Sequence, residues 1–115
     1  MQINKFGNGP WPEVVEDGTS VTIKVGEDSL TLNCLDLQRE VPVVLDIVKA
    51  ENGDLVVGTQ HGQSYVANIS IPASKFHFEG EDEEMEKIID PLTDLFAVDL
   101  NLWTVEKVEN NTMEV

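Results

Sequence analysis

The sequence has few basic residues, and this argues against binding to nucleic acids and to anionic membrane surfaces. The 115 residues contain 7 Lys and Arg against 22 Asp and Glu, so the net charge is −15, and no two basic residues are adjacent. Binding to DNA or RNA without sequence preference needs clustered cations that neutralise phosphates. We therefore expect no direct nucleic-acid ligand, and an anionic membrane surface is disfavoured for the same reason.

Cysteine and long hydrophobic runs are also scarce. Cys34 is the one cysteine, which leaves no intrachain disulfide and no thiolate zinc site. It lies in a strand-like run, so we interpret it as a small buried residue rather than a reactive thiol. No apolar run is long enough to span a bilayer, and the first residues lack the apolar stretch of a secretory signal. These features predict a cytoplasmic protein with no membrane contact.

Motifs for catalysis and cofactor binding are missing as well. Neither glycine-rich phosphate-binding pattern is present, and no nucleophile-elbow pattern surrounds a serine. The two histidines, His61 and His77, lie on different expected elements, which is weak support for a metal site. A pocket that brought either histidine within hydrogen-bonding reach of a carboxylate would favour an enzyme. Without it, we expect no enzymatic activity, no cofactor and no metal.

The remaining composition is that of one globular domain over residues 1–115, with 41% hydrophobic and 25% charged residues. According to three criteria, namely the alternation of apolar and polar residues, the positions of turn residues and the charge, the chain divides into five segments. These are an extended N-terminal arm without regular structure (1–18), an antiparallel β-meander (19–78), an acidic loop or short helix (79–91), a C-terminal strand (92–108) and a tail (109–115).

Period-two alternation is the main signal within residues 19–78. Val21, Ile23 and Val25 share one face of a strand that forms a hairpin with the run ending near residue 37. Residues 41–71 predict a three-stranded meander, whose first turn contains Asn52-Gly53. Residues 74–78 predict a short strand with both phenylalanines on one face and His77 on the other. About 6–7 strands in total indicate an antiparallel β-barrel or β-sandwich.

The next segment has helical spacing. Met85, Ile88 and Ile89 are placed at i, i+3 and i+4, which predicts a short acidic helix near residues 81–90 that ends before Pro91. Residues 91–97 fit either helix or strand, and residues 97–107 alternate as a strand does.

Charge is concentrated in residues 79–99, where nine acidic residues and Lys87 give a net charge of −8. Three interpretations apply: a solvated surface that keeps the protein soluble, a docking site for a basic partner, or a divalent-cation site. Consecutive carboxylates lack the spacing of a calcium loop, so a cation site would be weak. The candidate partner-binding residues are Glu81, Asp82, Glu83, Glu84 and Glu86.

Two functional hypotheses follow. The first is a non-enzymatic protein-interaction or assembly module, whose partner has a basic surface; exposed edge strands would also allow self-association. The alternative is an inhibitor that mimics nucleic acid and occupies the basic groove of a nucleic-acid-binding protein. Such mimicry needs carboxylates in long rows, whereas the chain outside residues 79–99 has a net charge of only −7.

Overall fold

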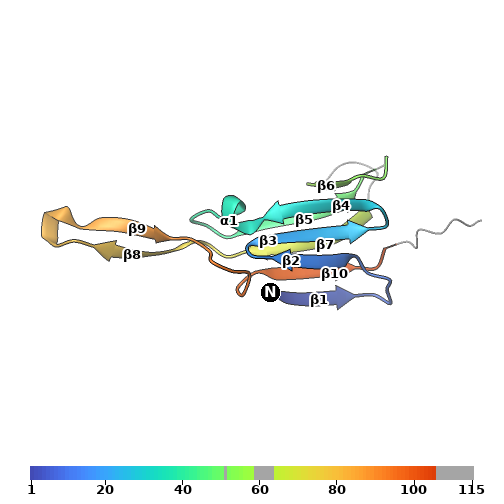
Figure 1. The fold of residues 1–115 in the computed structure, drawn as a ribbon, viewed down its shortest axis with the longest axis horizontal. Coiled ribbons are helices and arrows are strands. Elements are labelled where there is room, and N and C mark those ends of the chain that lie inside the picture. Colours follow the sequence, from blue (N-terminus) through green and yellow to red (C-terminus); the bar gives the residue numbers. More distant parts are fainter. Residues whose placement is uncertain (51, 59–63, 106–115) are drawn as a thin grey trace, which may run out of the picture.

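The computed structural model describes residues 1–50, 52–58 and 64–105. It is mainly β, with several antiparallel sheets and one short α-helix (Figure 1). The strands are β1 (Gln2–Phe6), β2 (Glu13–Asp17), β3 (Ser20–Val25), β4 (Asp28–Asn33), β5 (Val43–Lys49), β6 (Leu55–Val57), β7 (Ser64–Ile71), β8 (Lys75–Glu79), β9 (Glu86–Asp90) and β10 (Asp99–Trp103). The helix α1 is Cys34–Leu37, and Asp82–Glu84 form the 3-10 turn η1. Within the described residues, no helix is long and apolar enough to cross a membrane.

The strands form three sheets of unequal size. Five strands pair in the order β1-β10-β7-β5-β6, and three pair in the order β2-β3-β4. These two sheets lie against each other and make up what we call the body. The third sheet, β8-β9, extends beyond one end of the body (Figure 1).

The core lies between the two larger sheets. Val21, Ile23 and Val25 of β3 are buried there, which confirms the predicted apolar face of that strand. From the five-stranded sheet, Ile69 and Leu100 join the same cluster of buried side chains. The predicted hairpin is also confirmed as β3–β4, but its second strand ends at Asn33 and not near residue 37, because the Asn33 side chain accepts from the N–H of Leu35 and caps the helix α1. Cys34 is fully buried at the start of α1, which confirms its interpretation as a core residue.

The expectation of an N-terminal arm without regular structure is wrong. β1 pairs in parallel with β10, and β2 pairs antiparallel with β3. Glycine and proline in this region lie between the strands and not within them: Gly7 and Gly9, with positive φ angles, are in the connection between β1 and β2, and Gly18 is in the turn between β2 and β3, so they do not interrupt the pairing of either strand. Trp11 in this connection packs against the core and donates its indole N–H to the carbonyl of Phe6 at 2.8 Å.

The strand order within residues 41–71 also differs from a meander. The Asn52-Gly53 segment does join two antiparallel strands, β5 and β6. However, β7 pairs with the other side of β5 rather than with β6, so β5 is central and β6 lies at the sheet edge. The eight-residue β7 pairs along the whole of β5, whereas the three-residue β6 pairs only with its end at Ile47–Lys49. The turn predicted around His61 lies outside the described residues.

The predicted acidic helix over residues 81–90 is wrong as well. Only η1 is helical there, and Glu86–Asp90 form strand β9, paired with β8. An isolated amphipathic helix needs a surface for its apolar stripe, and the body offers none at this distance. Pairing with β8 satisfies the backbone instead. Residues 91–98 form bends and turns, neither helix nor strand. The last strand is Asp99–Trp103, and the predicted tail lies outside the described residues.

Candidate functional site

The β8–β9 hairpin, residues 75–90, is the most exposed part of the described chain, and we call it the arm. None of its residues is buried, and only Ile88 is half-buried. The arm nevertheless contains four large apolar side chains that are 41% to 56% exposed, namely Phe76, Phe78, Met85 and Ile89. Because none of its residues is buried, the arm is not part of the packed core of the body.

One face of the arm is apolar. Phe76 lies opposite Ile89 in the strand register, and Phe78 lies opposite Lys87, so these four side chains share a face. The two phenylalanine rings meet edge to face with centroids 5.7 Å apart. The Lys87 ammonium lies 4.5 Å from the centre of the Phe76 ring and also pairs with Glu40 of the body. The one cation on this face is therefore neutralised within the chain.

The opposite face of the arm is charged and centres on His77. Its Nδ1 lies 2.8 Å from a carboxylate oxygen of Asp90, and its Nε2 lies 2.7 Å from one of Glu79. Carboxylates only accept hydrogen bonds, so both contacts are hydrogen bonds only when the imidazole carries two protons. The hydrogen bonds to Asp90 and then Glu79 accordingly raise the pKa of His77 above its ordinary 6.5.

An enzyme would require a pocket in which a histidine lies within hydrogen-bonding reach of a carboxylate. His77 is within reach of carboxylates, as such a function would require, but its side chain is 45% exposed and both ring nitrogens are occupied by its neighbours. The hollow that Asp90 lines does not include His77. In the described part of the chain, no group of His, Cys, Asp and Glu side chains could hold a metal ion. Through its contact with Asp90, His77 links β8 to β9.

The predicted partner-binding residues lie together at the far end of the arm. Glu81, Asp82, Glu83 and Glu84 form the tip, and Glu86 begins β9. All five are exposed, and none forms an ion pair with any other described residue. The element that carries these residues is the end of a hairpin instead of the predicted helix.

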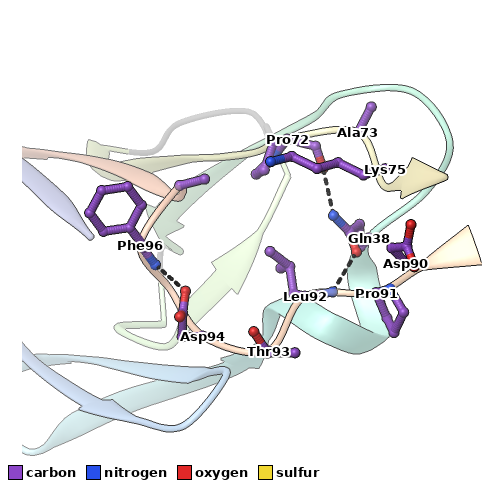
Figure 2. A pocket seen from close by; sticks show the side chains of 11 residues that line it. Gln38, Pro72, Ala73, Lys75, Asp90, Pro91, Leu92, Thr93, Asp94 and Phe96 are labelled. Atoms are coloured by element: carbon purple, nitrogen blue, oxygen red, sulfur yellow. Dashed lines mark hydrogen bonds between the residues drawn. The ribbon is translucent and has the colours of Figure 1, made fainter. Parts of the chain in front are cut away.

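The arm is held at its root by Gln38, which follows α1 (Figure 2). Its side-chain amide N–H donates to the carbonyl of Pro72 at 3.0 Å, and its side-chain oxygen accepts from the N–H of Leu92 at 3.1 Å. Pro72 precedes β8 and Leu92 follows β9, so one side chain bridges both ends of the arm. A cavity of about 320 Å³ adjoins this bridge and is lined by Lys75 and Asp90 among others.

A second hollow, of about 340 Å³, lies at the root on the side of the apolar face. Leu35, Ile89 and Pro91 provide apolar walls, and Arg39 lines it as well. The Arg39 guanidinium donates to the backbone carbonyls of Asp36 and Gln38. Among the described residues Arg39 has no carboxylate partner, so its positive charge is available at the surface.

Sequence reasoning missed Gln38 and this hollow. Gln38 stands in a polar connection with no local pattern, and its two partners are more than 30 residues away in the chain. The apolar face was visible in part, since Phe76 and Phe78 alternate with His77. Ile89 joins them only through the pairing of β8 with β9.

Comparison with known proteins adds no family to this description. The chain matches no known family model, and neither the curated proteins nor the solved structures include a significant match.

Proposed function

We propose that the protein is a non-enzymatic protein-interaction or assembly module and that the arm is its contact element. The observation that carries the proposal is the position of the arm, which exposes Phe76, Phe78, Met85 and Ile89 outside the body. A two-stranded hairpin on its own is only marginally stable in water. Contiguous apolar side chains exposed on a folded protein mark contact surfaces, so a partner that covers the arm would stabilise it.

We infer that the partner presents basic residues to the tip of the arm. Glu81, Asp82, Glu83, Glu84 and Glu86 gather there without an opposite charge, and like charges at close range raise the free energy of the folded state. A cationic surface would lower that free energy and would speed association. The acids lie at one end of a short hairpin, which supports a single contact better than the long carboxylate rows that a nucleic-acid mimic needs.

We further infer that the body is a β-sandwich rather than a barrel. The five-stranded and three-stranded sheets have separate strand orders and contribute to one common core, as the two layers of a sandwich do. Its role in this proposal is to hold the arm in a fixed direction, through the bridge that Gln38 makes at the root.

A matched pair of charge variants tests the proposal in affinity capture from the native host. The tip variant replaces Glu81, Asp82, Glu83 and Glu84 by their amides, which removes four charges and retains shape. The control removes the same charges from three Glu and one Asp outside the arm, all of them exposed: Glu13, Glu16, Glu27 and Asp17. We expect capture to fall with added salt and to be lost in the tip variant alone. Equal capture by both variants would exclude the tip as the contact.

A further inference from the structure

The apolar face of the arm suits a particular partner, and this inference rests on the proposed function. We propose that the partner is a second copy of this chain, and that two arms pack against each other through their apolar faces in antiparallel orientation. In such a dimer a two-fold axis brings the same side chains together from both copies, so an apolar face meets an identical apolar face. Phe76, Phe78 and Ile89 of one arm would then cover those of the other.

Packing of two arms against each other would stabilise a hairpin that is only marginally stable on its own. One arm is two strands with one exposed apolar face, whereas two stacked arms are four strands in two layers around a small core. Lys87 does not oppose the contact, since its charge is already paired with Glu40 and lies over the Phe76 ring. The contact therefore buries no unpaired charge on this face.

The charges along the arm select the antiparallel orientation. The tip is acidic, whereas Arg39, which lines the hollow at the root on the side of the apolar face, carries a positive charge that no described carboxylate neutralises. Antiparallel arms place the tip of each copy at the root of the other, so opposite charges meet. Parallel arms would place the two acidic tips together. The tip would then meet the positive charge of Arg39, although the net charge of the second copy is negative.

The same orientation keeps the acidic bodies apart. Strands of five residues, such as β8 and β9, are roughly 17 Å long at about 3.3 Å per residue. With antiparallel arms the bodies lie at opposite ends of this length. Charges this far apart are largely screened, because the Debye length is about 8 Å at physiological salt. The net charge of −15 on each chain therefore allows this arrangement.

The hollow at the root offers a seat for the tip of the second copy. Its walls include Leu35, Ile89 and Pro91, and the tip carries one apolar side chain, Met85, which is 53% exposed. In the antiparallel arrangement Met85 of one copy reaches the hollow of the other, and the tip acids come beside Arg39. At each end of the contact, Met85 would thus enter an apolar hollow while the tip carboxylates lie beside Arg39.

Sedimentation equilibrium of the full chain tests the proposal over a range of concentrations. We expect a dimer of the 12.8 kDa chain, and we expect Phe76→Ser together with Phe78→Ser to weaken it on the order of tenfold or more. Phe96→Ser is the matched control, since Phe96 is 85% exposed but lines the cavity on the other side of the root. A wild-type monomer at every concentration would overturn the inference, and so would equal weakening by both variants.

Disulfide cross-linking tests the orientation. We expect Met85→Cys and Leu35→Cys, each alone, to give no linked dimer, and their mixture to give one. Linkage of Met85→Cys with itself would overturn the antiparallel arrangement. These outcomes are separate from those of the charge variants: a monomeric protein that still captures another partner through its tip would refute self-association and leave the proposed function intact.

Discussion

The side-chain oxygen of Gln38 accepts a hydrogen bond from the backbone N–H of Leu92, while its amide group donates to the carbonyl of Pro72. Both ends of the arm are thereby joined to the segment that follows α1. We expect Gln38→Ala to remove this bridge and to leave the core unchanged. The lost hydrogen bonds are worth about 1 kcal/mol each.

The measurement for this variant is amide hydrogen exchange. The Leu92 amide and those of residues 75–90 should exchange faster, while the core amides of β3 and β7 keep their rates. Gln2→Ala is the control, because Gln2 is exposed and its side-chain amide donates a hydrogen bond to Asn4 of the same strand. Unchanged protection at Leu92 would contradict the role of Gln38.

The tip of the arm depends on a glycine. Gly80 has a φ of +99°, and a Cβ at this position would lie 2.4 Å from the backbone oxygen of Glu84. We expect Gly80→Ala to unfold the tip and lower the stability of the β8–β9 pairing by more than about 1 kcal/mol. Gly53→Ala is the control, since Gly53 has a φ of +96° and no atom within 4 Å of that Cβ. Hydrogen exchange in the arm should rise in the first variant and not in the second.

The stability of the arm should depend on pH through His77. Its pKa is raised above 6.5, mainly by Asp90 and less by Glu79. A raised pKa in the folded state means that protonated His77 stabilises the arm below pH 6.5, and that this stabilisation is lost as pH rises through the higher folded value. An NMR titration of the His77 ring should show a midpoint above 6.5.

Amide variants of the two carboxylates separate their effects on this titration. We expect Asp90→Asn to lower the midpoint more than Glu79→Gln does, following the order of the two causes. A midpoint that neither change moves would show that the imidazole does not bridge both carboxylates in solution.

A row of amides crosses the five-stranded sheet and ends on a carboxylate. Asn68 donates to Asp46 at 2.8 Å and accepts from Asn101 at 3.4 Å. Asn68→Asp would set two carboxylates side by side, so we expect the free energy of unfolding at neutral pH to fall by about 1–3 kcal/mol. Urea denaturation of the variant and of the wild-type protein at neutral pH should show this difference. Asn8→Asp, at an exposed position, should have little effect.

Cys34 should react slowly with thiol reagents in the folded protein. It is fully buried, and burial raises the pKa of its thiol, so little thiolate is present and reagents cannot reach it. We expect labelling to proceed only as the protein opens. Cys34→Ser should cost about 1–3 kcal/mol by burying a hydroxyl group, and more than Cys34→Ala does. Labelling at the rate of a free cysteine would contradict this placement.

Local patterns predicted the local parts of this fold. The alternation in residues 20–33 identified β3 and β4, because neighbouring strands joined by a short turn leave both signals in one stretch of sequence. β1 was missed because its partner β10 is at the other end of the chain, and parallel pairing leaves no turn signal. Long-range pairing of this kind depends on the finished fold.

The arm illustrates a different limit. Ile88 and Ile89 fit the spacing of a helix with Met85, yet in β9 they lie on opposite faces, one opposite His77 and one opposite Phe76. Three apolar residues are too few to separate the two periods. The acidic residues of the tip could be identified from the sequence without deciding between helix and strand.

The parallel pairing of β1 with β10 also sets an order in time. Ile3 faces Leu100 in the register, so β1 cannot take its place in the sheet until β10 has been synthesised. The β3–β4 hairpin has no such requirement and can form as soon as it leaves the ribosome. Closure of a long chain segment costs entropy before its contacts form. The five-stranded sheet should therefore be completed late, by a strand that is synthesised long before its partner.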